Sequence, residues 1–265
     1  MLHLYHNDMS VCAQKVRMVL AHKDLSWEGT HVNLRAGEQF SPDFRKISPK
    51  GLVPVLVHDG DVITESNAIV EYLDEVFIDA PLFPQDAVQR AYTRVWLIRL
   101  DAGLHEQVAV ISFCVAFRHQ LLQRHATDES LQGFFAQIPD PARRAVMEDI
   151  VTNGMESSRL RFAVLAYDKL IKDMASALEN SDWLVGGNIS LADFAMLPYI
   201  ERLEQLQLSG WWVQYPQLDH WLTRMRATHG YKTGVGEWSN PSYVGLMKES
   251  GSVGAWSKMK ALLAV

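Results

Sequence analysis

The sequence predicts a two-part architecture, with a small α/β domain that contains a mixed sheet followed by an all-helical domain. Over residues 1–80, strand and helix patterns alternate in the order β-α-β-α-β-β-α, which predicts a sheet with helices packed on it. Two prolines within residues 80–84 then mark a linker, and from Asp86 onward only helical periods occur. A chain of 265 residues has room for one or two such domains.

The elements of the first domain follow from hydrophobic periodicity and from turn residues. Apolar side chains from Cys12 to Val19 recur at helical spacing, and Asp59 and Gly60 form a strong hairpin signal between two apolar runs. We therefore expect strands over Leu2–Tyr5, Trp27–Leu34, Leu52–Val57 and Val62–Ile63, and helices over Ser10–Lys23, Gln39–Ile47 and Ser66–Phe77.

The rest of the chain is predicted to be helical, with one long connection and a loop-rich end. The segment His125–Pro141 contains turn residues and prolines, so we expect a long connection there. Residues 229–265 contain six glycines and several aromatic residues. We expect a loop-rich extension that docks on the body, and a poorly ordered tail is the alternative. The predicted division is 1–80, 86–228 and 229–265.

The charge balance argues against nucleic acid and membrane partners. The chain has 25 basic and 31 acidic residues and a formal net charge of −6. It therefore lacks the overall positive field that holds nucleic acid or an anionic membrane, although a local basic groove stays open. The longest apolar run, Val108–Phe117, is about half the ~20 residues that a spanning helix needs. The first residues do not have a signal-peptide pattern either.

The cysteine content predicts a reducing, cytoplasmic environment. Cys12 and Cys114 are the two cysteines, too few for a disulfide framework in a chain of this length. No set of histidine, cysteine and carboxylate residues has the spacing of a zinc site, so we expect no metal.

Ser10 and Cys12 lie where the first strand ends and the first helix begins. A helix start offers free N–H groups and the positive end of the helix dipole, which stabilise a thiolate more than a thiol. The Ser10 hydroxyl could donate one more hydrogen bond to such a thiolate. On these residues alone, the alternative is that Ser10 only caps the helix and that Cys12 is a small buried apolar side chain.

Val53 and Pro54 lie between two apolar runs, where a mid-strand proline would remove a ladder donor. A cis peptide bond would explain the proline by turning the chain, and it could expose the Val53 backbone to an extended peptide. An edge strand with a trans proline is the alternative.

Glu65 and Ser66 open a predicted helix, with Ser66 as a suitable N-cap. A helix N-terminus favours a carboxylate and Glu65 could pair with an ammonium group, so the dipeptide could hold the head group of an amino acid. A plain helix cap beside an exposed glutamate is the alternative.

Together, and in this order, these motifs resemble the glutathione S-transferase superfamily. The features that carry the resemblance are Ser-x-Cys at 10–12, Val-Pro at 53–54, Glu-Ser at 65–66 and Ser-Leu-Ala-Asp at 190–193. The resemblance implies a thioredoxin-like N-terminal domain, an all-helical C-terminal domain and a homodimer. It also implies glutathione as the co-substrate and no metal.

The resemblance assigns the thiol end of glutathione to the first helix. Ser10 matches the serine that hydrogen-bonds the glutathione thiolate in the serine-type classes, and Cys12 matches the cysteine of the zeta-class Ser-Ser-Cys motif. Pro54 matches the cis-proline of the family. Val53 matches the residue whose backbone pairs with the cysteinyl unit of glutathione.

The two ends of glutathione and the second substrate are assigned in the same way. Glu65 and Ser66 match the pair that holds the γ-glutamyl group, and Gln39 aligns with a polar position near the glycine carboxylate. Met9 and Phe117 are expected beside an apolar substrate pocket between the two domains.

The resemblance implies a transferase in which the glutathione thiolate attacks an apolar aromatic electrophile, by aryl ether cleavage or a similar displacement. The Ser-x-Cys segment is similar to bacterial tetrachlorohydroquinone reductive dehalogenases, whereas 62–66 and 94–96 are similar to bacterial lignin β-etherases. Two alternatives stay open. One is a reductive dehalogenase or thiol transferase that uses Cys12, and the other is a glutathione-fold protein that binds without catalysing.

Overall fold

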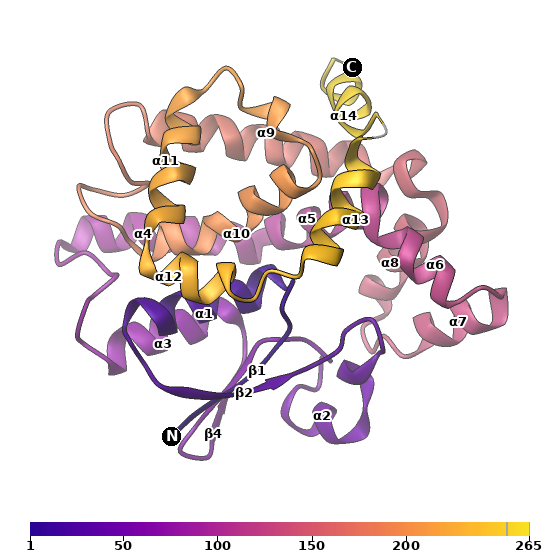
Figure 1. The fold of residues 1–265 in the computed structure, drawn as a ribbon, viewed down its shortest axis with the longest axis horizontal. Helices are drawn as coiled ribbons and strands as arrows, with labels where there is room; N and C mark the ends of the chain where they lie inside the picture. Colours follow the sequence, from indigo (N-terminus) through magenta and orange to yellow (C-terminus); the bar gives the residue numbers. More distant parts are fainter. Residues whose placement is uncertain (253, 265) are drawn as a thin grey trace.

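The computed structural model describes residues 1–252 and 254–264, and it places a small sheet beneath a larger helical layer (Figure 1). The predicted fold class, a thioredoxin-like N-terminal domain with an all-helical C-terminal domain, is confirmed. The N-terminal elements are β1 (Leu2–His6), α1 (Val11–His22), β2 (Trp27–His31), the turn η1 (Glu38–Phe40), α2 (Pro42–Ile47), β3 (Val55–His58), β4 (Asp61–Ile63) and α3 (Ser66–Val76).

The sheet has the order β2-β1-β3-β4 and mixes both strand directions, as expected. β1 is parallel to β2 and antiparallel to β3, with Tyr5 opposite Val55. Antiparallel pairing places the end of one strand beside the start of its neighbour. The residues after β1, which lead to Ser10, therefore lie at the same end of the strands as Val53 and Pro54, which precede β3.

The helical domain contains one helix that the sequence did not predict. Asp128–Ala136 forms α7, where we expected a connection, because the Thr127 side chain accepts a hydrogen bond from the Ser130 N–H and starts a helix. The other helices before residue 228 are α4 (Ala87–Arg99), α5 (His105–Ser112), α6 (Arg118–Arg124), α8 (Pro141–Asn153), α9 (Arg159–Ala177), α10 (Leu191–Gln205) and α11 (Pro216–Ala227). Shorter helical turns are η2 (Leu100–Leu104), η3 (Phe113–Phe117), η4 (Gly154–Glu156) and η5 (Ser209–Trp211).

The prediction of a loop-rich extension was wrong, because the described part of 229–265 is mostly helical. Its elements are α12 (His229–Tyr231), η6 (Lys232–Gly236), α13 (Pro241–Ser252) and α14 (Ala255–Leu263). The glycines that suggested loops allow close packing instead. A Cβ on Gly234 would lie 2.5 Å from the backbone nitrogen of Met18, and one on Gly251 would lie 2.0 Å from the Leu206 carbonyl oxygen.

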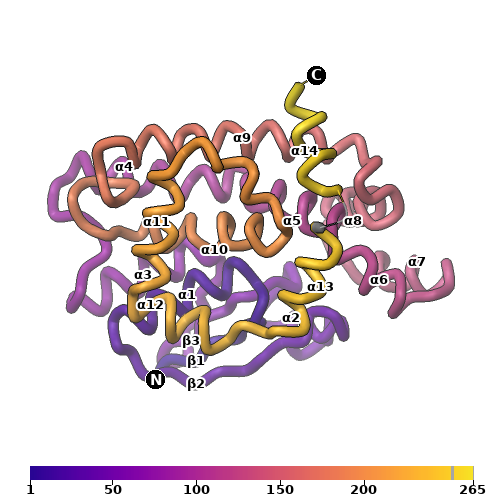
Figure 2. The backbone as a smooth tube through the Cα atoms, turned by 45° about the horizontal axis from the view of Figure 1, so that its top comes forward, coloured from indigo at the N-terminus to yellow at the C-terminus, as the bar shows by residue number. Residues whose placement is uncertain are grey.

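The extension docks on the body, as the first of the two expectations stated. It crosses from the sheet side to the far end of the helical layer (Figure 2), and α12 and η6 pack against α1. The buried Arg17 donates to the carbonyl oxygens of Asn7, Asp8 and Gly234 at 2.8–2.9 Å. The positive charge of Arg17 thereby ties α1, the loop after β1 and the extension together.

One hydrophobic core joins the two domains. Buried side chains of α1 and α3, such as Val16 and Leu73, belong to the same cluster as Phe194 of α10 and Trp221 of α11. Helix α10 begins at a fully buried carboxylate, Asp193, which accepts hydrogen bonds from four groups. The donors are the N–H groups of Leu184 and Ser190, the Ser190 hydroxyl and the Trp221 indole N–H.

The helical run 87–124, which comprises α4 to α6 with η2 and η3, is long and apolar enough to cross a membrane by length and composition alone. One side of it packs against the helical domain, since α4 contacts α10 and α5 contacts α9, while a face of α4 stays exposed. Buried side chains of the run, such as Trp96, Leu97 and Val108, belong to the core of the helical domain.

Candidate active site

Ser10 is the N-cap of α1, at the edge of the sheet where β1 ends. Its backbone is extended, and its side-chain oxygen accepts a hydrogen bond from the Ala13 N–H at 3.3 Å. The capping alternative is therefore part of the structure. It does not compete with thiolate binding, because a hydroxyl that accepts from the backbone keeps its own proton free to donate.

Cys12 lies in the first turn of α1 and contacts two side chains of the helical domain. The Sγ atom is 3.4 Å from Nδ1 of His105 and 3.6 Å from the Tyr199 hydroxyl. These two partners also contact each other at 3.2 Å. His105 reaches this position because η2, directly before it, bends at Gly103, whose φ of 129° suits only glycine.

The surroundings of Cys12 favour its thiolate. Burial raises the pKa of the thiol, but the charge of His105 and its hydrogen bond lower it, and so do the charge of Lys15 and the Ser66 hydroxyl; the result is a pKa of about 6, against an ordinary value of 9.0. In return, the negative charge of Cys12 raises the pKa of His105 against the effect of burial. Cys114 behaves in the opposite way, since burial raises its pKa to about 12.

The residues expected to bind the backbone and the γ-glutamyl end of glutathione lie near the start of α1. The Val53–Pro54 peptide bond is cis, so the first of the two alternatives is correct. The N-cap of α3 is Glu65, whereas the sequence had suggested Ser66. Glu65 has a φ of 66°, which costs a non-glycine residue of the order of 1–3 kcal/mol and is typical of ligand sites.

Ser66 and Glu65 face different partners. The buried Ser66 hydroxyl accepts from the Lys15 ammonium at 3.1 Å, while the exposed Glu65 carboxylate pairs with Lys50 at 2.7 Å. Ser66 therefore lies toward Cys12 and α1, and Glu65 lies toward solvent, where an incoming ammonium group could reach it.

Gln39 is buried in η1, and only one of its two polar side-chain atoms has a hydrogen-bond partner among the described residues. Its Nε2 donates to the Leu34 carbonyl at 3.2 Å, whereas Oε1 has no hydrogen-bond partner among residues 1–252 and 254–264. A buried acceptor without a partner costs about 1–3 kcal/mol, which a bound N–H donor would recover.

Met9 and Phe117, the two expected substrate contacts, meet through Arg202. The Arg202 guanidinium donates to the Met9 carbonyl at 2.5 Å and lies 4.9 Å from the centre of the Phe117 ring. Arg202 is buried and belongs to α10, so this contact also lies at the junction of the two domains.

Sequence reasoning missed His105, Tyr199 and Arg202. Tyr199 lies 187 positions from Cys12 and His105 lies 93 positions from it, and both occur in ordinary helical patterns. Only Tyr199 and Arg202 had a signal, because the segment 199–203 is similar to the bacterial reductive dehalogenases. Lys15 is buried, and on sequence it follows Cys12 within the segment that is similar to the bacterial reductive dehalogenases.

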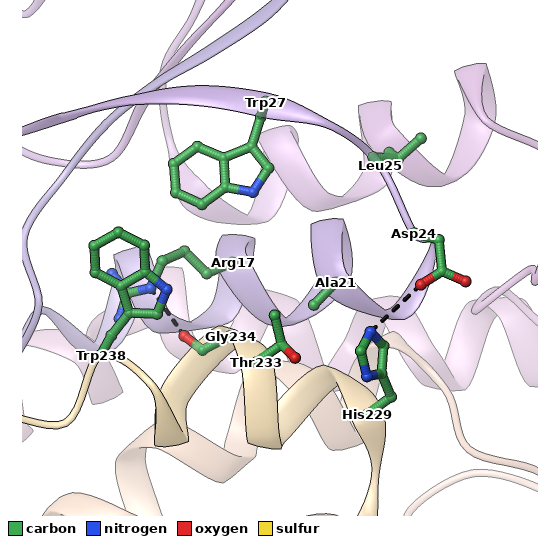
Figure 3. A pocket seen from close by; sticks show the side chains of 9 residues that line it. All are labelled: Arg17, Ala21, Asp24, Leu25, Trp27, His229, Thr233, Gly234 and Trp238. Atoms are coloured by element: carbon green, nitrogen blue, oxygen red, sulfur yellow. Dashed lines mark hydrogen bonds and ion pairs between the residues drawn. The ribbon is translucent and has the colours of Figure 1, made fainter.

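Neither of two cavities in the described part of the chain is lined by a predicted site residue. One of about 230 Å³ lies between α1, β2 and the extension, beside Arg17 and Trp238 (Figure 3). The other, of about 350 Å³, lies beside Tyr5 and Phe44 at the start of α2. Among the residues that the structure describes, no group of three histidine, cysteine or acidic side chains is placed to hold a metal ion.

Two family models match the chain, one in each half. The glutathione S-transferase N-terminal domain model matches residues 9–76, and the glutathione S-transferase C-terminal domain model matches residues 164–228. The first match includes Ser10 and Cys12. It also includes Gln39, the Val53–Pro54 pair and the Glu65–Ser66 pair. The second includes Asp193 and Tyr199.

Known proteins show the same relationship. Glutathione S-transferase Z1 of Arabidopsis thaliana is 45% identical over 115 residues, which are 42% of this chain and 52% of that protein, so the match spans about half of that relative. Protein LigF of Sphingobium sp. strain SYK-6 is 29% identical over 239 residues, 87% of this chain and 91% of that protein. The tetrachloro-p-hydroquinone reductive dehalogenase of Sphingobium chlorophenolicum is 24% identical over 236 residues, 87% of this chain and 94% of that enzyme.

A solved structure extends the likeness to the whole fold. The crystal structure of the β-etherase LigF from Sphingobium sp. strain SYK-6 has a TM-score of 0.80 and 28% identity, and the match covers 89% of this chain and 99% of that chain. The architecture, the two domain models and these relatives agree, and the chain belongs to the glutathione S-transferase family.

Proposed function

We propose that this protein is a glutathione transferase that holds glutathione as a thiolate at the start of α1. The thiolate attacks an electrophilic carbon of an apolar aromatic substrate, with aryl ether cleavage as the first candidate reaction. The observation that supports this most is the shared location of Ser10, the cis Val53–Pro54 bond and the strained Glu65 around one end of the sheet. The likeness of nearly the whole chain to a β-etherase supports the choice of reaction.

Each part of glutathione has a partner in this proposal. The Ser10 hydroxyl and the N-terminus of α1 stabilise the thiolate, and the Val53 backbone pairs with the cysteinyl unit. Glu65 and Ser66 receive the γ-glutamyl head group, and the unpartnered Oε1 of Gln39 accepts from the N–H of the glycyl unit. Met9 and Phe117 contact the apolar substrate, whose leaving group departs as a phenolate. The rate comes from proximity and from a ready nucleophile.

The experiment that tests the proposal is a titration of glutathione into the protein near pH 7, followed by the ultraviolet absorbance of the thiolate. We expect thiolate absorbance to appear in proportion to bound glutathione, because the site stabilises the charged form. Glutathione that binds as a neutral thiol would contradict the proposed activation. No binding would contradict the transferase proposal and the non-catalytic binding alternative together.

A second candidate function is a glutathione-dependent reductive dehalogenase or thiol transferase that uses Cys12. The contact of Cys12 with His105 and Tyr199 favours it, as does the likeness to a reductive dehalogenase. In that reaction Cys12 would resolve a glutathione–substrate adduct by forming a mixed disulfide. In ether cleavage, by contrast, Cys12 is not required.

We also propose a homodimer in the cytoplasm. Four apolar side chains along one face of α4 are more than half exposed in the single chain, and they are Val88, Tyr92, Val95 and Ile98. Such a continuous apolar face is typical of an interface between subunits. Both cysteines are free, which agrees with the reducing compartment in which glutathione is kept reduced.

Val95→Glu tests the dimer, because it places a charge in the centre of this face. In sedimentation at micromolar concentration, we expect the wild type to have twice the 30.0 kDa mass of the chain and the variant to shift toward the single-chain mass. Val213→Glu, at another exposed apolar position, is the control and is expected to keep the wild-type mass. A wild type of single-chain mass would contradict the dimer.

A further inference from the structure

We propose that Arg35 and Arg202 form a cationic wall of the substrate pocket, and that the aromatic substrate carries a carboxylate which these two guanidinium groups bind. This inference rests on the proposed function, since the two residues would bind the second substrate and not glutathione. The two side chains lie at the domain junction, have aromatic rings beside them and have no acidic partner of their own.

Both arginines lie near the loop that leads from β1 to α1. Arg202, on α10, donates to the Met9 carbonyl at 2.5 Å. Arg35 follows β2, and it lies near enough to Asp8 for the carboxylate to raise the pKa of the guanidinium. Asp8 and Met9 are neighbours in the chain. The two positive charges, one from each domain, therefore lie near the same short segment directly before α1.

Each guanidinium group lies over an aromatic ring. That of Arg202 is 4.9 Å from the centre of the Phe117 ring in η3, and that of Arg35 is 3.0 Å from the centre of the Tyr243 ring in α13. Helix α13 packs against η3, so the two rings come from adjacent elements. Arg35 and both rings are only half-buried, which leaves this part of the junction open to a ligand. An aromatic ligand could stack on the rings beside the two cations.

Arg202 has no acidic partner of its own. Among residues 1–252 and 254–264, no carboxylate lies within ion-pair distance of its guanidinium or of that of Arg35. Glu201 and Glu204, the acidic residues closest to it in α10, both pair with Arg226. Apart from the loop carbonyl, its acceptor is Oε1 of Gln205 at 3.5 Å, the limit of a hydrogen bond. A guanidinium has five N–H donors, so Arg202 keeps donors for a further ligand.

Arg17 shows how this protein holds a buried arginine whose role is structural. Its Nε, Nη1 and Nη2 all donate to backbone carbonyl oxygens, at 2.8–2.9 Å. Arg202 is buried to a similar degree, yet it has one such short bond. Because buried donors without partners are costly, this difference indicates a site that a ligand completes.

The two positive charges also repel each other. Burial lowers the pKa of Arg202 to about 10, and the charge of Arg35 lowers it as well. Burial likewise lowers the pKa of Arg35 to about 10, against the opposing charge of Asp8, whose carboxylate also contacts His31 and Asn240. Both arginines stay cationic near pH 7. A carboxylate bound between them would offset their repulsion, and its two oxygens match the planar fork of a guanidinium.

The second substrate is the expected source of this carboxylate. Arg202 contacts Met9 and Phe117, which are the two residues assigned to the aromatic substrate. The carboxylates of glutathione are assigned elsewhere, to the start of α3 and to η1. The substrate class is therefore an aromatic electrophile that carries a carboxylate on its ring.

The test compares a chloronitrobenzoate with the matching chloronitrobenzamide, which has nearly the same shape but no charge. Calorimetry in the absence of glutathione measures the binding of each, since neither has a nucleophile to react with. We expect the benzoate to bind the wild type at least about 10-fold more tightly, because hydrogen bonds between charged groups are worth that factor. Arg202→Met and Arg35→Gln should each remove most of this preference and leave binding of the benzamide nearly unchanged.

Arg161→Met is the control variant, because it removes the same charge from an exposed position of α9. It should keep the wild-type preference for the benzoate. A similar loss of preference in all three variants would reveal an effect of net charge alone and would overturn the proposal. So would equal affinity of the wild type for the two ligands, or no binding of the benzoate. If Arg202→Met fails to fold, the wild type and Arg35→Gln still decide.

Turnover with glutathione separates this inference from the proposed function. With the benzoate, both variants should have a KM about 10-fold higher at nearly unchanged kcat, and with the benzamide both should behave as the wild type. An equal fall in rate with both substrates would mean that the arginines act on the reacting atoms, and it would overturn the carboxylate site. Weaker binding of glutathione to Arg35→Gln would overturn it too, because the pair would then hold the glycyl carboxylate. Wild-type protein that prefers the benzoate but transfers no glutathione would contradict the transferase proposal and leave the carboxylate site standing.

Discussion

Replacing Ser10 by alanine is expected to lower the rate of glutathione transfer to an aromatic electrophile about 100-fold. The hydroxyl is the one side-chain donor at the start of α1 that we assign to the glutathione thiolate, and removal of a single donor to a reacting anion costs about 10²–10³ in kcat. The loss should appear in kcat/KM for a model haloaromatic at pH 7, together with a higher apparent pKa of bound glutathione.

Ser41→Ala provides a matched control for this substitution. Ser41 caps α2 with a hydrogen bond from the Phe44 N–H at 3.3 Å, the same distance as that of the Ser10 cap. Both substitutions should therefore cost a similar free energy of unfolding, about 1 kcal/mol. Only Ser10→Ala should change the transfer rate. Equal rates in the two variants would show that Ser10 is a cap alone and would remove it from the mechanism.

Asp193→Ala is expected to lower the free energy of unfolding by about 3–5 kcal/mol. The carboxylate is fully buried, and its loss would leave the Leu184, Ser190 and Trp221 donors in the core without an acceptor. Each donor that loses its partner keeps its desolvation penalty. Urea unfolding, followed by tryptophan fluorescence and circular dichroism, measures the difference.

Asp86→Ala is the appropriate comparison, because Asp86 also begins a helix but lies on the surface. It accepts one hydrogen bond, from the Gln89 N–H at 2.9 Å, so its loss should cost about 0.5–2 kcal/mol. A difference of less than about 1 kcal/mol between the two variants would contradict the view that Asp193 organises the start of α10. We expect both variants to unfold with nearly the same cooperativity as the wild type.

Local signals were sufficient for most of the N-terminal domain. The hairpin at Asp59 and Gly60, the helix α1 and the cap at Ser10 depend on neighbouring residues, and the structure contains all three. The errors fell where a local signal has two meanings. Prolines and turn residues in His125–Pro141 predicted a connection, yet α7 forms between them. The glycines of 229–265 predicted loops, yet Gly234 and Gly251 allow helices to pack closely.

The candidate site also has one part that local signals predict and one part that only the fold brings together. The residues assigned to glutathione lie in short motifs at the ends of secondary-structure elements, which a sequence displays directly. Their roles in binding stay predictions that the experiments above address. His105 has no such motif, and the segment 199–203 that contains Tyr199 gave a resemblance but no role in the site.

The sequence by itself determined the order of the elements, the change from a mixed sheet to helices, and the position of Ser10 and Cys12 at a helix start. Only the tertiary structure decided what surrounds Cys12. The packing of α1 against α10, and the bend at Gly103 before α5, bring His105 and Tyr199 to the sulfur. The physical reason is range: caps and periodicity act within a few residues, whereas the pKa of a buried thiol depends on charges and burial that the whole fold supplies.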